Sequence, residues 1–319
     1  YRRSLLAAVL RRIYRGYRNQ PLCVGHGLMR RAFAALIGPR QRVVLANGLR
    51  LDLDLNRVVQ NTIFWLDGDV EPALEWVVRE LVPPCGTMVD CGANCGFIGL
   101  LTRRLRRARV LFVEPHPRLA AAIRRNLELN GWSGDCLVVE AAASDAEGEI
   151  VLHEHPRQDG SHSVHKDWVE DGFGAGGEIR VEARTLGSVL AGLPGFERID
   201  FLKVDTEGHD LAVLRGLGEA LRPERIGAVY VELGRQREEG FRLLQGSGYE
   251  GFGVRILRRR ALNRLRRGQS RGEPVAYFHP WSEGSPPPAE TLWVPRGGPA
   301  AAFLSGVSAE GSRDSGHDF

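Results

Sequence analysis

Short apolar runs alternate with helical patterns along most of the chain. This alternation is typical of a mostly parallel sheet with helices on both faces. Seven runs have the length and apolar content of strands: residues 88–91, 109–113, 136–141, 199–204, 226–231, 249–254 and 291–294. We therefore predict an α/β fold built on a doubly wound, seven-stranded, mostly parallel, Rossmann-like sheet.

Residues 1–60 have a different pattern and are predicted to form an N-terminal extension. Apolar residues recur at helical spacing among arginines over residues 1–18, which predicts an amphipathic basic helix. Such a helix could lie on a membrane surface, but we expect it to cap the domain. Residues 42–55 alternate around Asn47-Gly48, a two-residue turn that is typical of a β-hairpin.

The main domain is expected over residues 61–296. A helical segment, residues 61–81, opens it and would serve as a lid or a packing element. An arginine-rich insertion covers residues 255–290. The Gly/Ser/Ala-rich residues 297–319 are predicted to be a disordered tail.

The first strand of this domain runs into a glycine-bracketed turn and then a helix. Gly92 and Gly96 let a ligand approach the backbone, and the helix N-terminus aims free N–H groups at it. Asp90 stands at the mouth of the turn. Its carboxylate would repel the pyrophosphate of NAD but suits a ligand that carries an ammonium and a sulfonium. The turn therefore predicts a site for S-adenosyl-L-methionine (SAM).

Further polar residues follow other strands, where the carboxyl ends meet at one edge of the sheet. Glu114 ends the second strand and could accept both hydrogens of a ribose diol. Small residues around Ala142 would admit the flat adenine ring. The run 199–204 delivers an acidic cluster to the same crevice, and this cluster comprises Asp205, Glu207, His209 and Asp210, with Lys203 just before it.

Six motifs stand out in this order: Val89-Asp-x-Gly-Ala-Asn-x-Gly96, Phe112-Val-Glu-Pro115, Asn126-Leu-Glu-Leu-Asn130, Lys203-Val-Asp-Thr-Glu-Gly208, Val213-Leu-Arg-Gly216 and Val231-Glu-Leu233. Over about residues 47–295 the chain resembles the FkbM family of SAM-dependent O-methyltransferases, which have the class I methyltransferase fold. By this resemblance, methyl transfer takes place at Lys203, Asp205 and Glu207. The cofactor would be bound by Asp90, Gly92, Ala93, Asn94, Gly96, Glu114, Pro115 and Ala142.

The chain departs from the family pattern at three places. Asp210 stands where a Glu is usual, and Thr185-Leu-Gly187 lacks the usual Asp. Cys95 replaces an aliphatic residue. The first two departures bear on the geometry of the acceptor, not on SAM binding.

The resemblance implies transfer of a methyl group to a hydroxyl of a saccharide, glycolipid or polyketide-type acceptor. Asp205 is the expected base, His209 is a second candidate, and acids that bind a divalent cation are an alternative. RNA methylation is another alternative, but residues 204–207 lack the Asn/Asp-Pro-Pro-aromatic loop of base N-methylation, so no nucleic-acid partner is expected. A SAM-fold binding protein without turnover remains open.

The basic residues are almost all arginine, and many of them lie in one segment. The formal net charge is +4, and 43 residues are Lys or Arg, of which only Lys166 and Lys203 are lysine. Eight arginines lie between Arg255 and Arg271, which suggests contact with an anionic membrane or acceptor. No apolar run approaches the length of a membrane span, so we expect a cytoplasmic protein, which could lie peripheral to the inner membrane through these arginines.

Histidines and cysteines give weaker signals. The segment around His153, His155, His162 and His165 has metal-like spacing, but its glycine-rich surroundings favour acceptor contact or plain surface. The five cysteines lack paired spacing, so neither a disulfide framework nor a zinc site is predicted. No metal is expected.

Overall fold

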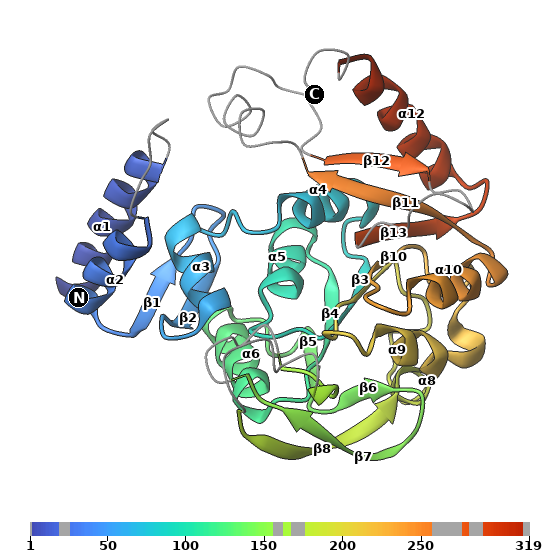
Figure 1. Ribbon diagram of the computed structural model, residues 1–319, viewed down its shortest axis with the longest axis horizontal. Helices are drawn as coiled ribbons and strands as arrows, with labels where there is room; N and C mark the ends of the chain where they lie inside the picture. The colour runs from blue at the N-terminus through green and yellow to red at the C-terminus, as the bar shows by residue number, and fades with distance from the viewer. Residues whose placement is uncertain are drawn as a thin grey trace.

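A computed structural model of the protein describes residues 2–18, 26–155, 162–166, 176–256, 276–280 and 290–314. Within these residues, eight strands form one sheet in the order β12-β11-β13-β10-β9-β3-β4-β5 (Figure 1). The neighbours from β10 to β5 are parallel, and β11, β12 and β13 join antiparallel. The strands are β3 (Thr87–Cys91), β4 (Arg109–Val113), β5 (Cys136–Val139), β9 (Phe201–Val204), β10 (Val229–Glu232), β11 (Tyr249–Ile256), β12 (Ala276–Pro280) and β13 (Glu290–Pro295).

The predicted fold class is confirmed, with β12 as one strand more than predicted. The parallel strands are apolar throughout because both of their faces are buried. On β3, Met88 belongs to the core on one face and Val89 to the core on the other. Helices α4 (Pro72–Leu81), α5 (Phe97–Arg106) and α6 (Pro117–Asn130) cover the Met88 face, whereas α8 (Leu186–Ala191), α9 (Asp210–Gly216) and α10 (Arg237–Gly246) cover the Val89 face.

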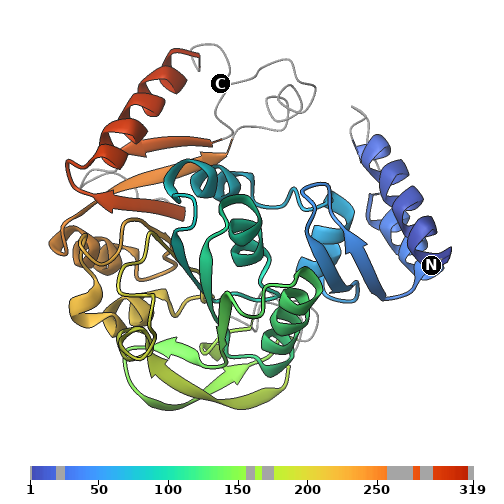
Figure 2. The same ribbon diagram turned by 180° about the vertical axis from the view of Figure 1, so that it is seen from behind.

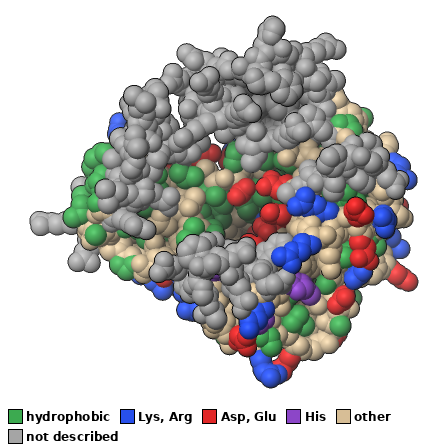
Figure 3. Space-filling model, in the orientation of Figure 1, with side chains coloured by type: hydrophobic (Ala, Val, Ile, Leu, Met, Phe, Trp, Pro, Cys, Tyr) green, Lys and Arg blue, Asp and Glu red, His purple; other side chains and the backbone are tan. Residues whose placement is uncertain are grey.

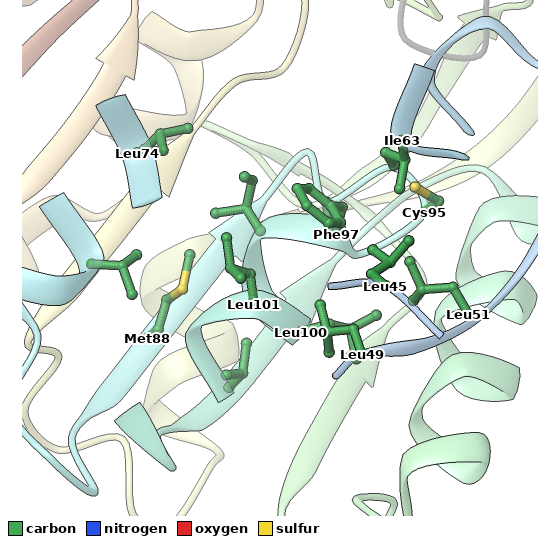
Figure 4. Close-up of a cluster of buried hydrophobic side chains, with 14 of the residues drawn as sticks. Leu45, Leu49, Leu51, Ile63, Leu74, Met88, Cys95, Phe97, Leu100 and Leu101 are labelled. Atoms are coloured by element: carbon green, nitrogen blue, oxygen red, sulfur yellow. The ribbon is translucent and has the colours of Figure 1, made fainter. Parts of the chain in front are cut away.

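The N-terminal extension packs against the helical layer formed by α5 and α6. It comprises α1 (Arg2–Arg18), α2 (His26–Ile37), the predicted hairpin of β1 (Arg40–Val44) and β2 (Arg50–Asp54), and α3 (Val58–Leu66). Leu45, Leu49 and Leu51 of the hairpin region point toward Phe97 and Leu100 of α5 (Figure 4). The hairpin and the main domain therefore share one core.

Two asparagines of the third motif hold the hairpin in place. Asn126 Oδ1 accepts a hydrogen bond from the backbone N–H of Asp52 at 2.8 Å. Asn130 accepts from the backbone N–H of Arg50 at 3.1 Å and donates to its carbonyl at 2.7 Å. This motif thus has a structural role, at a distance from the carboxyl ends of the strands.

Helix α1 lies with α2 at the outer end of the molecule (Figure 2). Ala7, Leu10 and Tyr14 on one face of α1 are buried, and the Tyr14 ring lies 5.2 Å from that of Trp65 in α3. The opposite face exposes Leu6, Val9 and Ile13. The buried face is the cap that the sequence led us to expect. Within the described residues, no helix combines the length and the hydrophobicity needed to cross a membrane.

A second, three-stranded sheet stands beside the main one. It has the order β6-β8-β7 and is formed by β6 (Ala142–Ser144), β7 (Gly148–His153) and β8 (Glu178–Thr185). Strands β7 and β8 pair antiparallel. The predicted strand 136–141 is shorter, because β5 ends at Val139 and the chain then leaves the main sheet.

The predicted disorder of residues 297–319 is wrong for most of this segment. Helix α12 runs over Pro299–Asp314, with Ala301 and Leu304 buried and the Phe303 ring stacked on Trp76 of α4 at 5.9 Å. A proline in the first turn and the alanines that follow favour a helix, and the contact with α4 stabilises it. Residues 257–275 and 281–289, which carry almost all of the arginine cluster, lie outside the described residues.

Candidate active site

A cavity of about 320 Å³ opens at the carboxyl ends of β3, β4, β9 and β10. Figure 3 shows acidic side chains gathered in the hollow on this face of the molecule. Every predicted site residue except Gly96 lines the cavity, namely Asp90, Gly92, Ala93, Asn94, Glu114, Pro115, Ala142, Lys203, Asp205, Glu207 and His209. The structure therefore brings together residues that lie more than 100 positions apart.

Both glycines of the turn after β3 adopt the left-handed backbone conformation. Gly92 has φ +70°, and a Cβ there would lie 1.9 Å from the carbonyl oxygen of Asp205. Gly96 has φ +80° and precedes α5, with side-chain atoms of Ile123 3.0 Å from the position of its Cβ. Gly92 thus allows the two loops of the site to touch, whereas Gly96 turns the chain into the helix.

Gly92→Ala is expected to lower the free energy of unfolding by at least about 3 kcal/mol, because backbone strain and a steric clash act together. Gly131→Ala is a matched control: Gly131 has φ +73° but nothing within 4 Å of a Cβ. It should lose only about 1–2 kcal/mol. Urea unfolding of both variants gives the comparison. Equal losses would show that the close approach to Asp205 does not matter.

A row of buried charged groups crosses the sheet beneath the cavity. Asp90 and Lys203 are register partners on β3 and β9, so their side chains leave the same face side by side. Lys203 Nζ lies 3.6 Å from Asp90 Oδ1 and 3.0 Å from Asp205 Oδ2, and it donates to the Gly92 carbonyl at 3.4 Å. The Lys203 ammonium therefore joins the turn after β3 to the loop after β9.

Burial and neighbouring charges act differently on the pKa of Asp90 and on that of Lys203. Asp90 is 1% exposed, and burial raises the pKa of its carboxyl despite the nearby Lys203. Burial alone would lower the pKa of Lys203, but the carboxylates of Asp205 and Asp90 outweigh it and raise that pKa above its usual range. Asp90 Oδ2 accepts from Gly99 N at 2.9 Å. Among the described residues, Oδ1 has no hydrogen-bond partner, and the cation beside it is Lys203 Nζ at 3.6 Å.

Glu114 is fastened by the backbone around it. Its Oε2 accepts from Asn94 N at 2.7 Å and its Oε1 from His116 N at 2.9 Å. Burial raises the pKa of Glu114 to about 7, although both of these hydrogen bonds lower it. Each carboxylate oxygen has a second lone pair, so two ribose hydroxyls fit here without displacing the protein contacts.

The loop after β9 carries both candidate bases, Asp205 and His209, but places them in different surroundings. His209 Nε2 lies 2.9 Å from Ser144 Oγ, and its Nδ1 lies 3.5 Å from His165 Nε2. Burial lowers the pKa of His209. Both of its ring nitrogens thus face protein groups. The Asp205 side chain, 35% exposed, faces the cavity and is the better placed of the two.

Residues 162–166, here called the strap, contribute His162 and Val164 to the cavity wall. Ser163 exchanges backbone hydrogen bonds with His153 at 2.8 and 3.1 Å, and its hydroxyl donates to the Glu207 carbonyl at 2.7 Å. His162 lines the cavity with its ring 4.8 Å from His116. In the described part of the chain, no group of three or more His, Cys, Asp or Glu is arranged to hold a metal ion.

Sequence reasoning missed four residues of the cavity wall: Glu71, Tyr230, Glu232 and Glu290. Glu232 ends β10 at the same edge as Asp205, which could have marked it. Glu71, before α4, and Glu290, at the start of β13, had no such signal. Tyr230 Oη donates to Glu290 at 2.7 Å. Burial, with the charge of Glu290, raises the pKa of Glu71 to about 7.

Known proteins resemble this chain in sequence and, more loosely, in structure. A family model described as the methyltransferase FkbM domain matches residues 90–261. Methyltransferase sdnD of Sordaria araneosa is 31% identical over 156 residues, which cover 41% of this chain and 60% of sdnD. Methyltransferase 1 of Beauveria bassiana is 26% identical over 165 residues, 47% of this chain and 66% of that protein.

Among solved structures, TYW2 of M. jannaschii in complex with AdoMet is 11% identical, with a TM-score of 0.39 and coverage of 80% of this chain and 85% of that chain. The human methyltransferase 10 domain containing protein is 12% identical, with a TM-score of 0.41 and coverage of 78% and 89%. The family match extends over more than half of this chain and includes both loops of the site. The chain therefore belongs to the FkbM methyltransferase family.

Proposed function

We propose that this enzyme transfers the SAM methyl group to a hydroxyl of a small-molecule acceptor, with saccharide, glycolipid and polyketide-type alcohols as the classes to test. The observation that carries this proposal is the Asp205 carboxylate, which faces the cavity and is held at Oδ2 by Lys203. An alcohol must lose its proton as the new C–O bond forms, and a positioned carboxylate can accept it.

The cofactor half of the cavity is assigned to the end near β3 and β4. Bound SAM supplies an activated methyl group on a sulfonium. Asp90 Oδ1 would accept from the ammonium, and both oxygens of Glu114 would accept from the ribose hydroxyls. Ala142 and Ala143, both buried, line the wall where the adenine would lie. Asp205 then faces the remaining space, on the acceptor side.

Glu114→Ala is expected to weaken SAM binding at least tenfold. Two charge-assisted hydrogen bonds of about 1.5–3 kcal/mol each would be lost, and tenfold corresponds to about 1.4 kcal/mol. Titration calorimetry measures the affinity. Glu128→Ala, an exposed site on α6, serves as a control with parent affinity. Unchanged affinity of the Glu114 variant would remove the ribose assignment.

The reaction itself is tested with methyl-labelled SAM and acceptors that differ only in the reacting group: a hydroxyl, an amine or a thiol on the same scaffold. Formation of S-adenosylhomocysteine reports turnover, and NMR of the labelled product identifies the atom methylated. An O-methyl product is expected. Methylation at nitrogen or sulfur alone would contradict the proposal, and cofactor binding without turnover on any acceptor would favour a binding protein.

A further inference from the structure

The cavity wall is strongly acidic. Seven carboxylates line it, but among the described residues only one lysine and no arginine do so. That lysine, Lys203, is already engaged by Asp90 and Asp205. SAM has two positive groups and one carboxylate, so its binding compensates one of the remaining negative charges. Counted over the described residues, the acceptor side of the cavity therefore keeps an excess of carboxylates after the cofactor has bound.

The excess negative charge lies where the acceptor would bind. Glu232 and Glu290 are register partners on β10 and β13, so two like charges stand directly opposite each other. Such a pair destabilises a sheet. Tyr230 donates a hydrogen bond to Glu290 and so stabilises only one carboxylate of this pair. Glu71, just before α4, lies close enough to Glu290 for the charge of Glu290 to raise the pKa of Glu71.

Glu232 is exposed at the cavity rim, but the surrounding protein still changes the pKa of its carboxyl. Partial burial, followed by the charge of Asp205, raises its pKa to about 7. Asp90 Oδ1 is buried without a hydrogen-bond partner among the described residues, and Lys203 Nζ lies 3.6 Å from it. In the proposed arrangement Asp90 binds the ammonium of SAM, and the sulfonium carries its methyl group toward Asp205. Neither positive group of SAM is therefore assigned to Glu71, Glu232 and Glu290.

We propose that the acceptor carries an ammonium group, which Glu71, Glu232 and Glu290 bind while the acceptor hydroxyl faces Asp205. The acceptor class is thus an amino alcohol or amino sugar, and anionic acceptors such as sugar phosphates are repelled. This inference rests on the proposed function for the position of the acceptor. A cation at this place separates the facing carboxylates of β10 and β13 and supplies a partner that none of the described residues provides for Glu71 and Glu232.

The test compares three probes that share a pyranose ring but differ in charge: methyl glucosaminide, methyl glucoside and methyl glucuronide. Each is titrated into the protein saturated with S-adenosylhomocysteine, in an amine-free buffer at pH 7.5. We expect the glucosaminide to bind at least tenfold more tightly than the glucoside, and the glucuronide more weakly still. Glu71→Gln and Glu232→Gln should each reduce this preference severalfold, whereas Glu219→Gln, exposed and outside the cavity, should not.

The affinity for S-adenosylhomocysteine shows that each variant is folded. Equal binding of the three probes, or no binding of any of them, would overturn the inference. The inference would also be overturned if Mg²⁺ bound to the cavity in a way that depends on Glu232 and removed the preference for the glucosaminide. The carboxylates would then hold a divalent ion. Methylation of the probe amine in place of a hydroxyl would contradict the proposed function and leave the charge preference standing, so the two failures are distinguishable.

Discussion

Asp205→Asn is expected to lower the rate of methyl transfer by about 10²–10⁴ while SAM still binds. The amide has nearly the shape of the carboxylate but cannot take the acceptor proton. Asp205 lies at the end of β9 with Lys203 Nζ 3.0 Å from its Oδ2, and its backbone carbonyl touches the turn at Gly92. Lys203 keeps Asp90 as a partner in the variant, so the buried charges stay compensated.

Single-turnover kinetics with saturating SAM measure this effect on the chemical step. Asp135→Asn, at an exposed site paired with Arg103 on the outside of the domain, should react at the parent rate. Parent-like transfer by the Asp205 variant would show that Asp205 is not the base. Activity that EDTA abolishes and Mg²⁺ restores would instead assign these acids to a metal-assisted reaction.

Lys203→Met is expected to cost about 3–5 kcal/mol of folding free energy, the range for removing one partner of a buried ion pair. Asp90 would then be buried at 1% exposure without a cation. Burial already raises the pKa of Asp90 in the parent. In the variant the folded-state pKa lies further above that of the unfolded chain. The variant is therefore most stable at low pH, where Asp90 is protonated, and loses stability as the pH rises through that folded-state pKa.

Urea unfolding across pH tests this prediction with a double variant. Lys203→Met combined with Asp90→Asn removes the charge that was left behind, so it should recover part of the loss and abolish its pH dependence. Lys166→Met, at an exposed position, should cost little. A double variant that is no more stable than Lys203→Met would mean that the cost comes from packing of the lysine chain.

The central sheet could be predicted because its parallel strands are buried on both faces. Continuous apolar runs such as residues 109–113 are hard to mistake for loops. β12 was missed because it lies within residues 255–290, which were interpreted as an arginine-rich insertion. α12 was missed because its Gly/Ser/Ala-rich sequence resembles a tail, and its stacking of Phe303 on Trp76 is visible only in three dimensions.

In the candidate site, too, some residues could be predicted from the sequence, whereas others depend on contacts in three dimensions. Asp90, Glu114 and Asp205 follow parallel strands, and the topology of such a sheet places all of their carboxyl ends at one edge. Glu290 comes from an antiparallel strand, so its place opposite Glu232 depends on register. The contacts of His209 with Ser144 and His165 depend on the second sheet and the strap. The sequence made this histidine a second candidate base only through the ordinary pKa of its side chain.

The position of β13 also has a consequence for how the enzyme is made. β13 is the last strand among the described residues, yet it lies between β10 and β11. A chain emerging from the ribosome therefore exposes the edges of β10 and β11 until residues 290–295 appear. The cofactor half of the cavity, built from residues 90–209, can form earlier in synthesis than the wall with Glu290, which needs residues 290–295. Nascent chains are thus expected to acquire affinity for SAM before they acquire affinity for the acceptor.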